Sequence, residues 1–489
     1  MNVKNAMLAL FVGCSSATMA TENPPPRPNI IICLADDLGW GSVGYNGAKV
    51  IKTPHLDKMA AEGARFDRFY SSGPVCAPSR ASILNGRHPS RTGVFSTSMG
   101  IMRPEEITIP EILKQNGYVT AHYGKWHLGM MVEGTRNKTR IYSPPSIHGI
   151  DEWFTSEIKV PTWDPMIKPV HFEGTETWRH GWRAIEPGEE SEPYGTTYHT
   201  HNGIATENLS GDSSRILMDR VIPFMEKSVA AEKPFLALVW FHAPHKPVVA
   251  GPEYAKMYKD QDWFMQQYAG CITAMDEQVG RMRDKLKELG IDDNTIVFFT
   301  SDNGPEHNTP GEAGGFRDRK RSLYEGGVRV PSLMVWPNKI KEPMVIDHPC
   351  VSSDYLPTIV DALEIDMPKS YPLDGESFFP LLEGKEFQRS APIGFDYWEQ
   401  RAFTDNRFKI YLKTPDSEIE LYDLINDKYE TENIADKHPE VVARLKKGFD
   451  EWFSSCKDSF EGKEYGTESL EKTGQTWADL SVNPKLKKK

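Results

Sequence analysis

The run Asn29-Ile-Ile-Ile-Cys-Leu-Ala35 fixes the architecture that we expect, and Asp36 and Asp37 follow it directly. An uninterrupted apolar run of this length is typical of a strand that is buried on both faces of a sheet. In open α/β sheets, ligands bind beyond the carboxyl ends of the strands. The sequence therefore predicts a central strand that carries two carboxylates to a functional edge.

Similar apolar runs recur along the chain, and helical patterns lie between them. The other expected strands are residues 119–123, 235–241, 295–300 and 332–336. The expected helices are residues 54–62, 109–116 and 263–289, followed by Gly63, Gly117 and Gly290 as C-terminal caps. Strands that alternate with helices predict an α/β fold, in which a large mixed central sheet is sandwiched by helices.

The periodicity changes in two places, which divides the chain. Residues 130–210 are rich in Gly, Pro, Trp and His, and we expect an irregular insert within a catalytic domain at 29–380. Beyond residue 380 the pattern predicts a smaller C-terminal α+β domain at 381–489. Its expected elements are short antiparallel strands at 393–397, 408–412 and 420–424 and a helix at 439–455.

The first residues are typical of a targeting segment. A basic Lys4, an apolar stretch and Thr18-Met19-Ala20 predict a signal peptide at 1–20, followed by a Pro-rich leader at 21–28. The alternative is lipoprotein processing at Cys14. Either reading predicts an exported protein, periplasmic or secreted. No later apolar run approaches the ~20 residues that a transmembrane span requires.

Charge and cysteine content narrow the function classes. The net charge of −12 argues against a nucleic-acid partner, because polyanions are repelled. An anionic substrate would need locally concentrated positive charge, for which Arg317–Arg321 is a candidate. Outside the leader, five cysteines lie far apart in the sequence, and none forms a CxxC pair. Because an odd number cannot all pair in disulfides, at least one thiol is expected to have another role.

Hard oxygen donors follow two of the expected strands. Asp36 and Asp37 end the first, and Asp302 and Asn303 follow the strand at 295–300. Adjacent carboxylates are costly to bury without a cation. Carboxylate and amide oxygens suit Ca²⁺ or Mg²⁺, although the same residues also favour turns.

The sequence Cys76-Ala-Pro-Ser-Arg80 is expected to begin a helix, because proline suits a first helical turn. Free N–H groups and the helix dipole would then favour an anion near Cys76. Arg80, one turn later, can make paired hydrogen bonds to a tetrahedral oxyanion. The combination indicates an anion-binding nucleophile site.

Cys76-Ala-Pro-Ser-Arg80 resembles the signature of the formylglycine-dependent sulfatases, members of the alkaline-phosphatase-like superfamily. The resemblance extends from about Asn29 to Glu364. Further matching segments are Asp36-Asp37, Gly124-Lys125-Trp126-His127, His242-Ala-Pro-His245, Ser301-Asp302-Asn303-Gly304, and Lys320 ahead of Glu325-Gly326-Gly327. One departure is Asn85, which stands where Thr usually precedes the closing Gly-Arg.

The resemblance implies specific roles for these residues. Cys76 is oxidised to formylglycine (3-oxoalanine) by a formylglycine-generating or anaerobic sulfatase-maturating enzyme. The implied metal ligands are Asp36, Asp37, the modified Cys76, Asp302 and Asn303, with Ca²⁺ favoured over Mg²⁺ in an exported protein.

The resemblance also implies how the ester is cleaved. Asp302 is the base for attack on sulfur, and His242, helped by Lys320, protonates the leaving alcohol. His127 is the base for sulfate release. Arg80, Lys125 and Lys320 hold the sulfate oxygens, and His245 is a substrate contact.

The expected reaction is hydrolysis of sulfate monoesters on a sulfated polysaccharide or its oligosaccharides. Aromatic and histidine side chains of the insert would form walls for a sugar or, equally, the insert's own core. These side chains are Trp153, Trp163, Trp178, Trp182, His180, His199 and His201. The alternatives are a phosphonate or phosphodiester hydrolase of the same superfamily and a catalytically silent glycan-binding relative.

Overall fold

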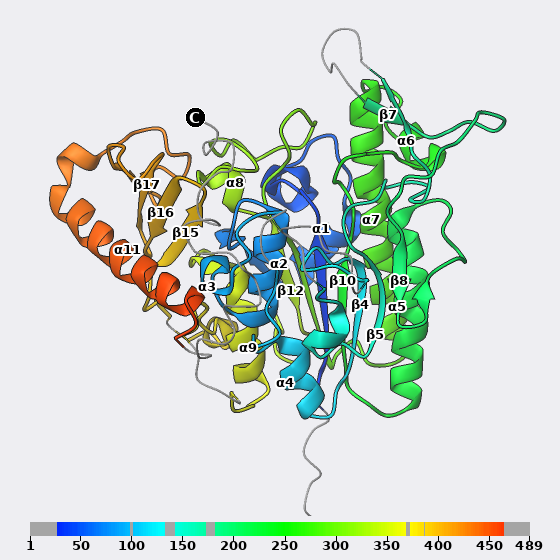
Figure 1. Cartoon of the computed structure of the whole chain (residues 1–489), viewed down its shortest axis with the longest axis horizontal. Helices are drawn as coiled ribbons and strands as arrows, with labels where there is room; N and C mark the ends of the chain where they lie inside the picture. Colours follow the sequence, from blue (N-terminus) through cyan, green and yellow to red (C-terminus); the bar gives the residue numbers. More distant parts are fainter. Residues whose placement is uncertain are drawn as a thin grey trace, which may run out of the picture.

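The computed structural model describes residues 27–97, 101–132, 142–172, 181–367, 372–385 and 387–463. The predicted signal peptide with Cys14 and most of the Pro-rich leader lie outside these residues. A large sheet with helices on both sides forms the body, and a smaller sheet with one long helix stands beside it (Figure 1). The predicted fold class is confirmed.

The central sheet is mixed. Within the described residues, ten strands lie in the order β13-β2-β12-β11-β1-β10-β4-β5-β8-β9. Strand β1 (Asn29–Ala35) pairs in parallel with β10 (Phe235–Trp240) and β11 (Thr295–Ser301), and β4 (Val119–Lys125) pairs in parallel with β10. The opposite edge contains β12 (Ser332–Val335), β2 (Ala64–Phe66) and β13 (Met344–Ile346), with β12 antiparallel to its neighbours.

Both faces of β1 are buried, which explains its continuous apolar sequence. Ile31, Cys33 and Ala35 belong to one core, together with residues of α1 (Pro54–Glu62), α5 (Ser213–Ala230) and α7 (Trp263–Glu288). The alternate residues Ile30, Ile32 and Leu34 belong to a second core, with α2 (Cys76–Asn85), α4 (Ile109–Gln115) and α9 (Tyr355–Ala362). The sheet therefore separates two hydrophobic layers.

The three expected cap glycines behave differently. Gly117 and Gly290 have φ of 86° and 67°, the left-handed geometry that favours glycine after a helix. Gly63 is the C-cap residue of α1, as expected, but its φ of −133° is extended rather than left-handed. A Cβ at Gly63 would lie 2.2 Å from the Met334 carbonyl oxygen, so the close approach of β12 requires glycine.

The insert is more regular than expected. Strand β5 (Glu152–Ser156) pairs in parallel with β4, and β8 (Tyr198–Thr200) and β9 (Gly203–Ile204) extend the central sheet. Strands β6 (Val170–Phe172) and β7 (Gly181–Arg183) form a separate pair. These strands are two to five residues long, too short to produce a periodic signal in the sequence.

In the C-terminal region, β15 (Ile393–Tyr397), β16 (Gln400–Thr404), β17 (Phe408–Leu412) and β18 (Glu420–Asp423) form an antiparallel sheet under α11 (Pro439–Phe460). Strand β16 was not expected from the sequence, and α11 extends beyond residue 455.

The remaining elements connect the layers. They are β3 (Phe69–Tyr70) paired with β14 (Cys350–Val351), α3 (Pro89–Thr92), α6 (Pro252–Lys256), α8 (Glu325–Val328) and α10 (Phe379–Leu382), with 3-10 turns at Trp40–Ser42, Gly44–Asn46, Pro145–His148, Ser352–Asp354 and Ala435–Lys437. In the described ranges, no helix has both the length and the apolar character to cross a membrane.

Candidate active site

Four neighbouring parallel strands deliver most of the predicted site residues to one edge of the sheet. In spatial order these strands are β11, β1, β10 and β4. The residues at or just beyond their carboxyl ends are Asp302 and Asn303, Asp36 and Asp37, His242 and His245, and Lys125 and His127. Because the strands run in parallel, segments far apart in the sequence meet at one place, as predicted.

Buried ion pairs organise the centre of this cluster. Lys125 Nζ lies 2.7 Å from Asp36 Oδ2, and Arg80 Nη2 lies 2.7 Å from Asp302 Oδ2 and 3.6 Å from Asp36 Oδ2. Arg80 also donates to the Lys125 carbonyl and covers the Trp240 ring, 5.2 Å from its centroid. All these charged side chains are at most 1% exposed, so each cation compensates a buried carboxylate.

Asp37 is the centre of a second group. Its Oδ1 accepts hydrogen bonds from Asn303 Nδ2 at 2.7 Å and from Lys320 Nζ at 2.5 Å. Its backbone N–H donates to Asp302 Oδ1 over 3.1 Å. Burial disfavours the charged form of Lys320, but Asp37 and the further negative charges of Glu306 and Asp36 together outweigh burial and raise the lysine pKa. Lys320 is therefore a fixed positive charge in the site.

The backbone is constrained at several site positions. Asp37 and His127 have φ of 68° and 60°, a left-handed conformation that is uncommon for residues other than glycine. A Cβ at Gly124 would lie 1.9 Å from the Trp240 carbonyl oxygen, and one at Gly304 would lie 2.0 Å from that of Gly326. Close backbone contacts thus explain the glycines of these motifs.

Helix α2 begins at Cys76, as predicted, and all ten of its residues are buried. The Cys76 sulfur lies in a cluster with Asp36, Asp37 and His245, whose ligand atoms are all within 4.8 Å of one another. Burial raises the thiol pKa to about 11, against the opposing effect of Lys125 and Lys320. Thiolates, rather than thiols, are nucleophilic at neutral pH. The unmodified side chain is thus a neutral thiol in this setting.

The predicted metal ligands fit a divalent cation. Asp36 Oδ1, Asp37 Oδ2 and Asn303 Oδ1 are buried and accept no hydrogen bond from the residues that the structure describes. Such unsatisfied oxygens are costly, and a cation would satisfy all three. Burial, followed by the charge of Asp36, raises the pKa of Asp302 to about 7. A nearby cation would reverse that shift, and hard oxygen donors suit Ca²⁺ or Mg²⁺.

The two histidines after β10 differ in their surroundings. His242 is fully buried, and neither ring nitrogen has a hydrogen-bond partner among the described residues. Burial lowers its pKa to about 3, so it is neutral at neutral pH and retains one N–H. His245 Nδ1 lies 2.6 Å from the Lys246 carbonyl oxygen, and Nε2 lies 3.6 Å from Asp37 Oδ2. His245 therefore presents Nε2 to the cluster.

Two further side chains lie near the site although no motif marked them. Lys159, from the insert, has a pKa lowered by partial burial and then by Lys125 and Lys320, which places a third ammonium near this group. Tyr397, at the end of β15, has a pKa raised by burial and influenced by Lys320 and Cys76. Neither residue lies in a recognisable sequence pattern, so only the folded chain reveals their proximity.

The described insert aromatics pack mainly against the protein itself. Trp182 lies 5.8 Å from Phe264, and Trp153 lies 5.8 Å from His201, measured between ring centroids. Both tryptophans flank the hydrophobic cores. Trp178 and His180 lie outside the described residues. The contacts of Trp153 and Trp182 therefore favour the core interpretation over sugar-binding walls.

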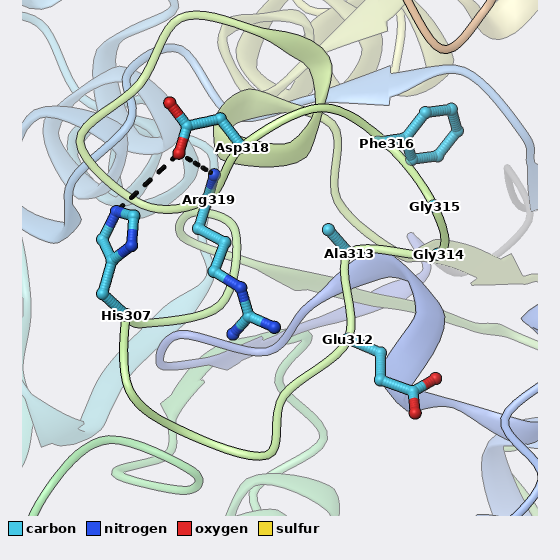
Figure 2. Close-up of a pocket in the computed structure, with 8 residues that line it drawn as sticks. All are labelled: His307, Glu312, Ala313, Gly314, Gly315, Phe316, Asp318 and Arg319. Carbon is cyan, nitrogen blue, oxygen red and sulfur yellow. Dashed lines mark hydrogen bonds and ion pairs between the residues drawn. The ribbon is translucent and has the colours of Figure 1, made fainter.

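A cavity of about 560 Å³ is lined by the segments around His307, Glu312–Phe316 and Asp318–Arg319 (Figure 2). His307, Asp318 and Arg319 line one side, with His307 Nε2 3.9 Å from Asp318 Oδ1, and the loop from Glu312 to Phe316 lines the other. His307 Nε2 is also 3.0 Å from the Lys320 carbonyl oxygen. The predicted catalytic residues do not line this cavity.

Comparison with known proteins agrees with the geometry. The family model described as Sulfatase matches residues 28–365, and one described as N-sulphoglucosamine sulphohydrolase, C-terminal, matches residues 311–454. N-acetylgalactosamine-6-sulfatase of Canis lupus familiaris is 31% identical over 392 residues, which cover 77% of this chain and 70% of that protein.

Solved structures share the fold. Ps i-CgsB in complex with k-i-k-neocarrahexaose has a TM-score of 0.75 and 24% identity, covering 93% of this chain and 99% of that one. A 6S-sulfatase structure from work on glycosaminoglycan metabolism by Bacteroides thetaiotaomicron has a TM-score of 0.71 and 26% identity, covering 88% and 100%. With a family model matching most of its length, this chain belongs to the sulfatase family of the alkaline-phosphatase-like superfamily.

Proposed function

We propose that this sulfatase hydrolyses sulfate monoesters on a sulfated polysaccharide or its oligosaccharides, using a nucleophile made from Cys76. The observation that carries the proposal is the position of Cys76. It begins a buried helix beside Lys125 and Lys320, next to the unsatisfied oxygens of Asp36 and Asp37. An anionic ester meets concentrated positive charge here despite the acidic composition of the chain.

The sulfatase family uses a formylglycine residue and a metal ion, usually Ca²⁺. For this chain we propose formylglycine at position 76 and Ca²⁺ held by Asp36, Asp37, Asp302, Asn303 and the modified side chain. The cation supplies positive charge that stabilises the developing negative charge. The hydrated aldehyde supplies one hydroxyl for attack on sulfur and a second that allows sulfate to leave.

The remaining roles belong to the chain's own side chains. Asp302 accepts the proton of the attacking hydroxyl, and paired hydrogen bonds from Arg80 hold its buried carboxylate in place for this role. The neutral His242 donates its N–H towards the leaving alcohol oxygen, with Lys320 holding the charge beside it. His127 accepts the proton of the second hydroxyl.

Three cationic side chains orient the ester. Arg80, Lys125 and Lys320 bind the sulfate oxygens, while their ion pairs with the carboxylates keep them in place before the ester arrives. His245 Nε2 contacts the bound ester at the edge of the cluster.

A sulfated sugar is the substrate class that we propose. Support comes from the N-acetylgalactosamine-6-sulfatase relative and from the sulfatase structure of the glycosaminoglycan-degrading Bacteroides thetaiotaomicron. We further propose that the catalytic domain at 29–380 and the C-terminal domain at 381–489 act as one exported enzyme, periplasmic or secreted. The leader is removed as a signal peptide or processed at Cys14. Modification of Cys76 then requires a maturating enzyme in the same cell.

Parallel turnover assays test the function. The protein, expressed with a maturating enzyme, is offered 4-nitrophenyl sulfate, a panel of sulfated oligosaccharides, and bis(4-nitrophenyl) phosphate. We expect the sulfate esters to be hydrolysed with the higher kcat/KM and activity to be lost in Cys76→Ala. Faster hydrolysis of the phosphodiester would favour a phosphodiesterase instead, and binding of sulfated glycans without turnover would indicate a catalytically silent relative.

A further inference from the structure

A second cavity, of about 870 Å³, lies between the catalytic body and the C-terminal sheet. Its walls include the turn at the tip of the β15–β16 hairpin, the face of β17, and the segment that follows Arg317. Aromatic side chains contribute much of the lining: Tyr324, Tyr397, Trp398 and Tyr411. The sulfatase roles already described do not use this cavity.

The cavity adjoins the proposed catalytic centre. Tyr397 lines it and is also close enough to Lys320 and Cys76 for their charges to act on its hydroxyl. Arg321, another lining residue, follows Lys320 directly, and its backbone N–H donates to the Pro74 carbonyl over 2.9 Å, two residues before Cys76. A molecule that fills the cavity therefore lies beside the segments that carry Lys320 and Cys76.

Trp398 is held in the wall at a conformational cost. With Glu399 it forms a two-residue turn between the paired residues Tyr397 and Gln400, and its φ is 54°. Glycine is the usual residue at such a position, and a bulky side chain with positive φ is an outlier. Arg401 fixes the turn by donating to the Trp398 carbonyl over 2.7 Å. Backbone strain of this kind concentrates at ligand-binding sites.

The charges of the cavity wall are largely compensated. Arg317 stacks on Tyr324, 3.8 Å from its ring centroid, and lies 3.6 Å from Glu420 Oε2. Arg321 forms a bidentate ion pair with Glu306. Among the lining residues that the structure describes, Lys413 is a cation without an ion-pair partner, and Asp318 and Glu399 add negative charge. The wall therefore offers aromatic faces and hydrogen-bonding groups with little net positive charge.

We propose that this cavity binds the sugar ring next to the sulfated one, and that this ring is a neutral hexose stacked on Trp398. The inference rests on the proposed sulfatase function. Aromatic faces rimmed by polar groups suit the apolar face and the hydroxyls of a pyranose. A uronate or a second sulfate would meet the carboxylates of Asp318 and Glu399, which outnumber the unpaired lining cation Lys413 in the described part of the wall. The cavity thus selects the sugar ring that adjoins the one bearing the sulfate to be hydrolysed.

Trp398→Gly is the variant that tests the stacking role. Glycine adopts φ of 54° without strain, so the exchange removes the ring and relaxes the turn. The assays compare 4-nitrophenyl sulfate, a sulfated monosaccharide from the turnover panel, and the disaccharide that adds a neutral hexose. We expect the disaccharide to lose between about two-fold and about ten-fold in kcat/KM, mainly through KM. Turnover of the aryl sulfate and the monosaccharide stays unchanged.

Trp263→Ala is the matched control, because Trp263 lies on α7, is 44% exposed and does not line the cavity. Equal losses on all three substrates, or none, in Trp398→Gly would overturn the inference. Preference for a disaccharide whose second ring is a uronate would also overturn it. If the enzyme hydrolyses the aryl sulfate but no sugar sulfate, the subsite proposal alone is refuted. If it hydrolyses no sulfate ester at all, the proposed function itself is refuted.

Discussion

Lys409 and Glu325 form a fully buried ion pair, with Lys409 Nζ 2.9 Å from Glu325 Oε1. Lys409 belongs to β17 of the C-terminal sheet, and Glu325 begins α8 in the catalytic body. Glu430 completes the group, with Oε1 2.9 Å from the same ammonium. The adjacent Gly327 carbonyl accepts the Gly304 N–H over 2.9 Å, beside Asn303. The C-terminal sheet therefore supports the turn that positions a predicted metal ligand.

Removing this cation should destabilise the whole protein. Lys409→Met leaves the buried Glu430 without an ion-pair partner among the described residues and leaves Glu325 with Arg329 alone, so we expect a loss of about 3 to 5 kcal/mol in the free energy of unfolding. Urea denaturation measures the change. Lys413→Met, in the exposed segment that follows β17, is the control and should stay within about 0.5 kcal/mol of the original. Equal stability of the two variants would show that the ion pair does not join the domains.

Arg80 should be irreplaceable by lysine. Its guanidinium donates to Asp302 Oδ2 through both Nε and Nη2, at 3.1 and 2.7 Å, and to the Lys125 carbonyl. A lysine ammonium cannot reproduce this fork. We expect Arg80→Lys to lower kcat for 4-nitrophenyl sulfate by about 10² to 10³. Arg220→Lys, an arginine on α5 outside the site, is the control, and comparable activity in both variants would contradict the role.

Calcium should stabilise the folded protein through the unsatisfied oxygens of Asp36, Asp37 and Asn303. A cation that binds only the folded state at 100 times its Kd adds about 2.7 kcal/mol, so Ca²⁺ should raise the Tm of EDTA-treated protein. Asp37→Asn, which keeps the shape of the side chain, should abolish most of the increase. A larger increase with Mg²⁺ would reassign the ion, and a Tm indifferent to EDTA and both cations would refute the site.

The free energy of unfolding should fall at acidic pH, because the Asp374 carboxylate links α3 to α11. Burial raises the pKa of this carboxyl, but the charge and hydrogen bonds of Arg91, 2.8 Å away, and the contributions of His88 together outweigh burial and lower the pKa to about 2. Trp452 Nε1 also donates to it over 2.7 Å. Because the folded pKa lies below the unfolded value of about 3.9, the stabilisation is complete above pH 4 and is lost towards pH 2.

Asp374→Asn tests that linkage. The charge-dependent difference in unfolding free energy from the original protein should be about 2 to 3 kcal/mol at pH 7 and should shrink as the pH falls from 4 to 2. Urea titrations at several pH values measure it, with Asp416→Asn as an exposed control. A difference that stays constant over this pH range would show that the charge of Asp374 is not responsible.

The sequence predicted the central sheet because both faces of β1 and its neighbours are buried, which leaves long apolar runs. It also predicted that Asp36 and Asp302 lie together, because parallel strands end at one edge, whereas the resemblance to sulfatases pointed to Lys125 and His242. Strand β16 escaped prediction because the turn at Trp398 lacks the usual glycine or asparagine.

Residues that reach the site from outside the motifs were also missed. Lys159 comes from the insert and Tyr397 from the C-terminal sheet, and tertiary packing alone brings them close to Lys320. Gly63, in contrast, was recognised in the sequence, but one of its two roles was not. This glycine caps α1 and also allows the close contact with β12, and the local sequence predicts only the cap.

The most direct test of the central claim is mass spectrometry of the tryptic peptide 69–80, which contains Cys76. The protein is produced with a maturating enzyme and assayed on 4-nitrophenyl sulfate, and the peptide that contains Cys271 is the internal control. We predict that the Cys76 CH₂–SH group is converted to an aldehyde or its hydrate in proportion to activity, while Cys271 stays a thiol. Fully active protein with an unmodified Cys76 would contradict the account.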